Sequence, residues 1–150
     1  PEAFETDLQI NFISLVKVIQ SVLPNLLASE QASLVTFSSV AATMGMPFHT
    51  SVAAAKGAIE GFAKALAAEY APKIRVNVIA PSLTDTPLAD KFLNNETKQE
   101  KSAERHPLKR FGKPEDSAQI ATFLLSDKSS WISGQIFHVD GGMSTLLVNG

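Results

Sequence analysis

Three short runs rich in β-forming residues alternate along the chain with stretches of helical periodicity, and this order constrains the fold strongly. The runs are SLVTFSS (33–39), IRVNVIA (74–80) and QIFHV (135–139). The first carries no charge, which is typical of a parallel strand covered on both faces. Strands that alternate with helices predict the α/β class, here a doubly wound parallel sheet with right-handed crossovers and helices on both faces.

The segments around these runs have helical or polar character. Apolar residues recur at helical spacing over 2–27, where Pro24 is expected to bend or restart the helix. A second helix is predicted over 51–70, and it should end there because Pro72 cannot continue it. A third is predicted to open at Pro114. The charged stretch 87–113 has little apolar periodicity, so we expect either an ordered lid or a disordered loop.

Composition limits the kinds of function. The chain has 150 residues, of which 45% are hydrophobic, and a net charge of −2. These values indicate one soluble globular domain and give no reason to expect nucleic acid or an anionic membrane as the main partner. Cysteine is absent, so a thiol nucleophile is impossible. No metal site is predicted, and we expect a cytoplasmic location.

The helix over 2–27 needs separate treatment, because Lys17 is its only charge between Leu8 and Ser29. Length alone would allow a membrane span. The helix also carries several polar residues, and no second apolar span follows it. We therefore expect burial on several sides inside a soluble assembly.

Small residues form a stripe along the helix over 51–70. They recur at three- and four-residue steps, as Ala54, Gly57, Ala58, Gly61, Ala65 and Ala68. Charged residues on this helix exclude a lipid setting. The stripe predicts a tight helix–helix contact in water, within the subunit or across an oligomer interface.

Polar segments follow each predicted strand, namely Ser39, Pro81–Thr86 and Asp140–Gly142. Active sites of α/β sheets lie beyond the carboxyl ends of the strands. The topology therefore predicts that these segments meet in one crevice. Asn11, a polar amide among apolar neighbours, is ordinarily explained by hydrogen bonds to backbone or water.

Six segments together resemble the carboxyl-terminal half of a short-chain dehydrogenase/reductase, over nearly the whole chain. They are INFISLV, FSS, AAAKGAIEGFAKALAAE, RVNVIAPSLTDT, GKPEDSAQIATFLLSD and WISGQIFHVDGG. Each is weak alone, but their order and spacing are specific. The resemblance implies that 1–150 is the carboxyl-terminal part of a single Rossmann-like domain that binds NAD or NADP. It also implies hydride transfer between nicotinamide and a small carbonyl or alcohol substrate.

The resemblance assigns roles by position. Asn11 would hold a water of the proton relay, Ser39 would hydrogen-bond the substrate oxygen, and Lys56 would bind the nicotinamide ribose. The residues implied to receive the cofactor are Pro81, Ser82, Leu83, Thr84 and Thr86. The stretch 87–113 would close over substrate as a lid. Helices 2–27 and 51–70 would pair subunits in a homo-oligomer, a dimer or tetramer.

Two departures from the family pattern concern the cofactor. No G-x-x-x-G-x-G turn is present, so we expect the chain to be a fragment whose sheet continues in an amino-terminal half. The residues that choose NAD or NADP would lie in that half. Ser82 stands where glycine is usual, a mild change that adds a possible hydrogen bond to cofactor.

The third departure is Val52, which stands at the position of the catalytic tyrosine, one helical turn before Lys56. Valine can neither donate nor accept a proton, and acid–base catalysis typically supplies about 10²–10⁴-fold in rate. His49 is the local alternative, because an imidazole titrates near neutral pH. His49 is thus either a proton donor in a shifted position, near Met44, Met46 and Phe48, or a histidine without chemistry.

Two functions follow from these observations. The first is an oxidoreductase with an altered proton donor, supported by Asn11, Ser39 and Lys56. The second is a catalytically impaired relative that binds dinucleotide or stabilises an oligomer. A binding module that uses the charged stretch for protein contacts is a weaker third possibility. The sequence does not identify the substrate.

Overall fold

Strand β2 (Ile74–Pro81) is the centre of a three-stranded parallel sheet. β1 (Ala32–Phe37) pairs with one side of it and β3 (Ile136–Val139) with the other. The computed structural model describes residues 1–148. Its strands match the three β-rich runs, and the α/β class with a parallel sheet is confirmed.

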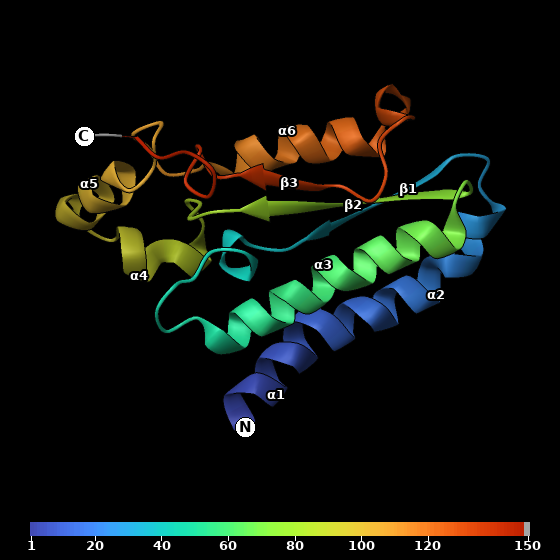
Figure 1. Ribbon diagram of the computed structural model, residues 1–150, viewed down its shortest axis with the longest axis horizontal. Coiled ribbons are helices and arrows are strands. Elements are labelled where there is room, and N and C mark those ends of the chain that lie inside the picture. The colour runs from blue at the N-terminus through green and yellow to red at the C-terminus, as the bar shows by residue number, and fades with distance from the viewer. Residues whose placement is uncertain (149–150) are drawn as a thin grey trace.

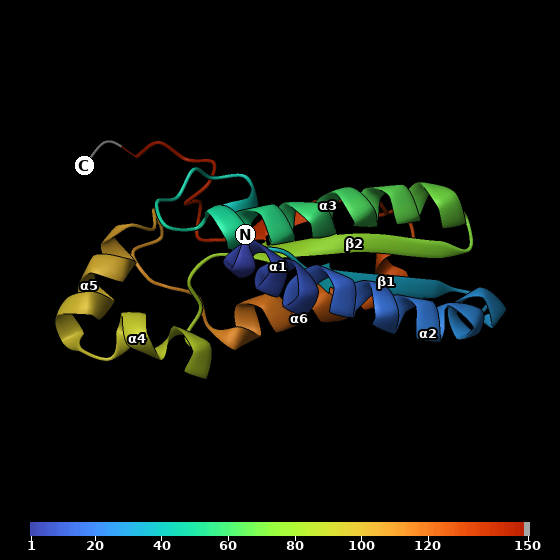
Figure 2. The same ribbon diagram turned by 90° about the horizontal axis from the view of Figure 1, so that it is seen from below.

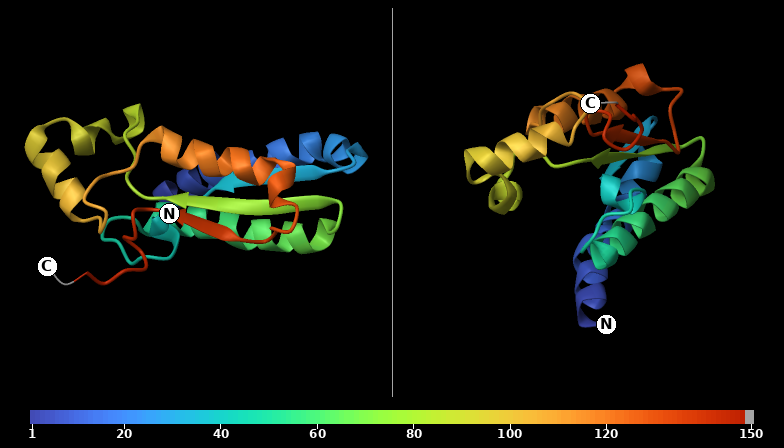
Figure 3. Two further views of the ribbon diagram at one scale, coloured as in Figure 1. Left: turned by 90° about the horizontal axis from the view of Figure 1, so that it is seen from above. Right: turned by 60° about the vertical axis from the view of Figure 1, so that its left-hand side comes forward.

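Helices cover both faces of the sheet (Figures 1 and 3). α2 (Ser14–Ala28) and α3 (Thr50–Tyr70) lie on one face, and α6 (Pro114–Leu125) lies on the other. Val76 and Val78 of β2 belong to the core against α2 and α3, together with Leu66. Arg75, which alternates with them, points to the other face and donates to the carbonyl oxygens of Leu124 and of residues 126 and 129. It thereby satisfies backbone groups at the end of α6.

The two crossover connections between the strands do not have the same hand, although both were predicted to be right-handed. The strand order β1–β2–β3 follows the chain, while the connections through α3 and α6 pass over opposite faces. When two connections step in the same direction across a parallel sheet but pass over opposite faces, one of them is right-handed and the other is left-handed. One of them is therefore left-handed, against the usual preference for right-handed crossovers, so the expectation that both are right-handed is wrong.

The first helix is continuous from Glu2 to Ala28 but changes its hydrogen-bonding pattern. It comprises α1 (Glu2–Leu8), a π-helical segment η1 (Gln9–Ile13) and α2. Pro24 lies inside α2, and the helix continues past it without the expected restart. Phe12 of η1 packs edge-on against Phe62 of α3, with ring centroids 5.6 Å apart. This contact and the apolar face of α2 hold the helix against α3.

Much of this helix is exposed. By length and composition, Glu2–Ala28 could cross a membrane: its most apolar 18-residue window has a mean hydropathy of 1.5, and only 6% of that window is buried. Ile10 and Val18 are 65% and 59% exposed. A Cβ added at Gly57 or Gly61 of α3 would meet no atom within 4 Å in the described residues. The small-residue stripe thus has no tight partner at these two glycines inside the described chain.

The stretch 87–113 contains ordered short helices, although its sequence has little apolar periodicity. These are η3 (Pro87–Ala89), α4 (Asp90–Leu93) and α5 (Glu96–Glu104). Asn95 caps α5, because its Oδ1 accepts from the backbone N–H of Lys98 at 2.9 Å. Figure 2 shows α4 and α5 beyond the ends of the strands. This end of the sheet also carries η2 (Val40–Ala42) and the loop to α3.

Both outer strands of the sheet have an unpaired edge within residues 1–148, since β1 and β3 each pair only with β2. At the far end of α6, the short helix η4 (Asp127–Ser129) leads toward β3. The six-residue β1 presents the longer free edge.

Candidate active site

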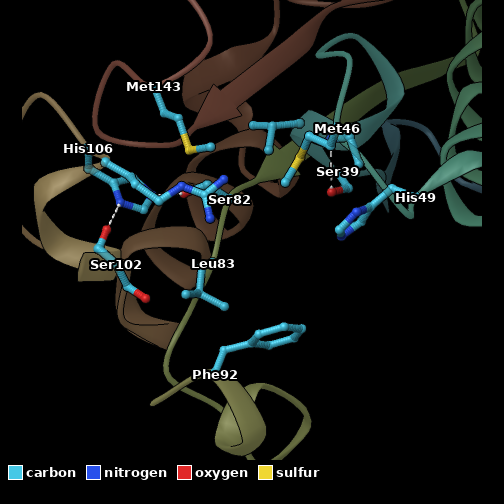
Figure 4. Close-up of a pocket in the computed structure, with 12 residues that line it drawn as sticks. Ser39, Met46, His49, Ser82, Leu83, Phe92, Ser102, His106 and Met143 are labelled. Carbon is cyan, nitrogen blue, oxygen red and sulfur yellow. Dashed lines mark hydrogen bonds between the residues drawn. The ribbon is translucent and has the colours of Figure 1, made fainter. Parts of the chain in front are cut away.

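A cavity of about 250 Å³ lies at the carboxyl edge of the sheet (Figure 4). Four parts of the chain line it: the end of β1 with the following loop, the end of β2, the helices over 87–113, and the turn after β3. Its lining residues are Ser39, Val40, Ala41, Met46, His49, Ser82, Leu83, Phe92, Ser102, Arg105, His106 and Met143. The cavity therefore joins two of the three segments that the topology predicted to meet, through Ser39 and through Ser82 and Leu83. The third segment, Asp140–Gly142, lines an adjoining hollow instead.

Ser39 follows β1, and its hydroxyl hydrogen is not donated to any group within residues 1–148. Its Oγ accepts a hydrogen bond from the backbone N–H of Ala41 at 3.2 Å, which caps η2. The preceding Ser38 is buried and donates through Oγ to Oε1 of the buried Glu60 at 2.7 Å. Because Ser38 is anchored to α3, Ser39 has a fixed position at the cavity wall. Its remaining O–H can donate to a ligand oxygen.

His49 lies at the start of α3 on the same part of the cavity wall as Ser39 (Figure 4). Its Nδ1 is 2.7 Å from the carbonyl oxygen of Pro47. A carbonyl only accepts, so Nδ1 carries a hydrogen and Nε2 is left to exchange a proton with a ligand. The preceding Phe48 has φ 63°, a left-handed conformation that is uncommon for a bulky residue. Backbone strain of this kind is often found at functional sites.

Val52 and Lys56 lie in the first turns of α3, and neither lines the cavity. The Nζ of Lys56 donates to the carbonyl oxygen of Phe37 at 3.3 Å. Partial burial lowers the pKa of Lys56. Since this long hydrogen bond uses one of three N–H groups, the ammonium can still donate to another acceptor.

Ser82, after β2, and His106, after α5, form a hydrogen-bonded pair. Ser82 Oγ is 2.9 Å from Nε2 of His106, and Nδ1 of His106 is 2.7 Å from the carbonyl oxygen of Ser102. Because that carbonyl must accept, the neutral ring carries its hydrogen on Nδ1, and Ser82 donates to Nε2. His106 is only 2% exposed. No local sequence pattern reveals this pair, which lies 24 residues apart along the chain.

The other residues assigned by resemblance lie outside the cavity wall. Asn11 sits in the π-helical segment, where its Nδ2 donates to the carbonyl oxygen of Asp7 at 2.9 Å. Pro81 precedes Ser82, and Thr84 Oγ1 donates to the carbonyl oxygen of Ser82 at 3.0 Å, but neither residue lines the cavity. Thr86 borders a separate shallow hollow with Asp85 and two neighbours. Of the predicted residues, the structure thus gathers Ser39, His49, Ser82 and Leu83.

A second hollow of about 340 Å³ adjoins the first, and Ser82 and His106 line both. Asp140 lies on its wall after β3. Burial acts to raise the pKa of Asp140, but hydrogen bonds from Ser144 and from the Gly142 N–H outweigh it, so the net pKa is lowered. Asp140 therefore holds the turn after β3 as a carboxylate. No group of three or more histidine, aspartate or glutamate side chains within residues 1–148 is arranged to hold a metal ion.

Many known proteins are similar to this chain in sequence or in fold. A family model described as enoyl-(acyl carrier protein) reductase matches residues 1–144. The 3-oxoacyl-(acyl-carrier-protein) reductase FabG of Thermotoga maritima is 38% identical over 143 residues, which is 95% of this chain and 57% of the relative. An inactive 2-(S)-hydroxypropyl-CoM dehydrogenase 2 of Xanthobacter autotrophicus is 38% identical over 132 residues, covering 85% and 57%.

Solved structures give the same picture. A gluconate 5-dehydrogenase from Burkholderia cenocepacia, in complex with NADP and tartrate, superposes with a TM-score of 0.91 at 26% identity, covering 98% of this chain and 58% of that one. A 3-oxoacyl-(acyl-carrier protein) reductase from Brucella melitensis with bound NAD has a TM-score of 0.84 at 32% identity, covering 97% and 53%.

The chain thus spans somewhat more than half the length of these relatives. The family model covers nearly all of it, and the fold, the strand-end cavity and the six sequence segments agree with the match. This chain belongs to the short-chain dehydrogenase/reductase family.

Proposed function

We propose that the protein carrying this chain is an NAD(P)(H)-dependent oxidoreductase that reduces a small carbonyl compound, or oxidises the alcohol, with an altered proton donor. The observation that carries the proposal is the shared cavity of Ser39 and His49, whose free O–H and Nε2 lie on one wall. Two polar groups able to donate to one oxygen are what carbonyl reduction requires.

The cofactor is NAD or NADP, since relatives of this fold have been solved with each of them. The residues present fit such a group. Lys56 has donors to spare for ribose hydroxyls, and the segment Pro81–Thr86 offers backbone groups at a strand end. When bound, the nicotinamide supplies or accepts the hydride.

Residues of this chain bind the carbonyl oxygen of the substrate and supply the proton that it receives. Ser39 donates a hydrogen bond to the carbonyl oxygen and orients it. His49, protonated on Nε2 and steadied by the Pro47 carbonyl, delivers the proton as that oxygen gains negative charge. Asn11 holds a water molecule of the proton relay. The helices over 87–113 exclude bulk water from the cavity as a lid.

A catalytically impaired relative is the second candidate, favoured by Val52. The phenol expected one turn before Lys56 is missing, and one relative of this chain is itself described as inactive. Dinucleotide binding would persist in such a protein, because the segment around Pro81 does not depend on residue 52.

Homo-oligomerisation in the cytoplasm completes the proposal. The exposed apolar side chains of the first helix and the open glycines of α3 lie where a second subunit would cover them. Burial in a dimer or tetramer explains the apolar composition of this helix without a membrane.

One experiment separates the two functions. The full-length protein is titrated with reduced cofactors, and wild type and Val52→Tyr are assayed on a panel of carbonyl compounds. Activity in wild type supports the oxidoreductase. Cofactor binding with activity only in Val52→Tyr supports the impaired relative, and absence of cofactor binding contradicts both.

A further inference from the structure

Arg105 gives the cavity a charge that the proposed chemistry does not use. Among the twelve lining residues of the cavity there is no aspartate or glutamate, and Arg105 is the permanently charged one. The whole chain carries a net charge of −2, so this local excess of positive charge is a property of the cavity. A cavity of one sign attracts ligands of the opposite sign.

The other two arginines of the chain have internal partners. Arg75 donates to three carbonyl oxygens and one hydroxyl at the end of α6. Arg110 forms an ion pair with Asp116, with Nη1 2.6 Å from Oδ2. The guanidinium of Arg105, by contrast, makes no hydrogen bond or ion pair with any group in residues 1–148. Its five N–H donors are free for a ligand.

The backbone at Arg105 is fixed by the residue that follows it. His106 is buried and hydrogen-bonded to Ser82 at the end of β2 and to the Ser102 carbonyl in α5. Leu108 N–H donates to the carbonyl oxygen of Gly141 after β3 at 3.2 Å. The carboxyl end of α5 is therefore held to two strand ends, and Arg105 projects from an anchored position.

Polar side chains lie on two opposite sides of the cavity, and apolar side chains complete the wall. Ser39 and His49 lie on one side, and His106 and Ser102 lie across the cavity from them (Figure 4). Apolar side chains contribute between and around them, namely Met46, Leu83, Phe92 and Met143. The volume of about 250 Å³ lies just below the range of about 300–1,000 Å³ usual for ligand pockets. The cavity therefore suits a small ligand.

We propose that Arg105 is a specificity-determining residue that binds the carboxylate of a small oxo acid, while Ser39 binds the carbonyl oxygen to be reduced. The inference rests on the proposed oxidoreductase function and names its substrate class. A guanidinium binds a carboxylate through two parallel hydrogen bonds.

The test compares short-chain oxo acids with their methyl esters in the full-length protein. Wild type is expected to prefer each acid, measured as a ratio of kcat/KM values. Arg105→Gln is expected to lower that ratio about tenfold or more, as the loss of a charge-assisted hydrogen bond predicts. Arg105→Lys keeps the charge but loses the paired geometry, so it should retain part of the preference. Lys101→Gln, one turn earlier on α5 and outside the cavity wall, should leave the ratio unchanged.

An unchanged ratio in Arg105→Gln, or an equal fall in Lys101→Gln, overturns the inference. If wild type turns over neither acid nor ester, the proposed function fails by itself. The affinities of the same acids and esters are then measured by calorimetry in the presence of reduced cofactor. The ratio of the affinity for the acid to that for the ester, in wild type and in Arg105→Gln, decides the role of Arg105. A preference for acid that depends on Arg105 supports it, and equal affinities of acid and ester contradict it.

Discussion

The Oγ atom of Ser82 lies 2.9 Å from Nε2 of His106, and this hydrogen bond ties the end of β2 to the end of α5. Within residues 1–148, Nε2 is the only acceptor of this buried imidazole, because Nδ1–H donates to the Ser102 carbonyl. Ser82 therefore does structural work that glycine, the residue usual at this position in the family, cannot do. The pair fixes the wall between the two hollows.

Removing one partner of this pair should destabilise the protein. In His106→Ala, a buried ring is deleted and its hydrogen bonds are lost. In Ser82→Ala, Nε2 is left buried without a donor. We expect each to lower the free energy of unfolding by about 1–3 kcal/mol in urea titrations. Ser102→Ala is the control, because the contact uses the backbone carbonyl of Ser102, and an equal loss there would contradict this explanation.

The ion pair of Arg110 and Asp116 should make stability depend on acid pH. Hydrogen bonds from Arg110, and one from the Lys113 N–H, lower the pKa of Asp116 to about 2. An unfolded aspartate has a pKa of about 3.9, so the stabilisation is present above about pH 4 and is lost as the pH falls toward 2. The effect is small, since the arginine side chain is 51% exposed.

Asp116→Asn should therefore flatten the dependence of the melting temperature on pH between about 4 and 2. Asparagine keeps an oxygen that can accept from the Lys113 N–H, so the helix cap is retained. Asp127→Asn, at an exposed position in η4 without an ion pair in the described residues, serves as the control. The explanation fails if both variants keep the wild-type slope.

Gly57 and Gly61 of α3, which have open space beside them, indicate where subunits meet. A side chain at Gly61 meets no atom within 4 Å in the described residues, and leucine has a higher helix propensity than glycine. Gly61→Leu should leave helix content intact while shifting the full-length protein to a smaller species in light scattering. Gly45→Leu also enters open space, but in a loop, and should not change the assembly. An unchanged mass for Gly61→Leu would remove this face from the interface.

A tyrosine at position 52 should compensate for the loss of His49. The position is half-buried, one turn before Lys56 on α3. If a missing acid limits the rate, His49→Ala with Val52→Tyr should recover about 10²-fold or more in kcat over His49→Ala alone. Val52→Phe in the same background provides the ring without the hydroxyl and should not recover activity. Recovery by phenylalanine would indicate a packing effect instead.

The strands and helices were largely predictable, because their signals are local. The β-rich run at 74–80 became β2, and Pro72 and Pro114 marked the end and the start of helices as expected. The π-helical segment around Asn11 was not predicted, since it depends on a change of hydrogen-bond register that no residue preference encodes. Pro24 was expected to bend or restart the helix, and α2 continues through it without a restart.

The site was predictable only in part, because some of its residues are positioned by contacts between distant segments and not by local sequence. Ser39 and Ser82 follow strands, so topology alone places them at one edge. His106 and Arg105 come from a polar stretch without periodicity, and their positions depend on how α5 folds back onto the strand ends. Two basic residues in succession gave no signal that one would be buried and the other would face the cavity.

We propose that His49 delivers the proton that tyrosine delivers elsewhere in the family. The most direct test is kcat/KM for carbonyl reduction by the full-length protein, wild type against His49→Gln, with cofactor affinity measured in parallel. A fall of about 10²-fold or more with unchanged cofactor affinity is predicted. Turnover equal to wild type in His49→Gln would contradict the claim.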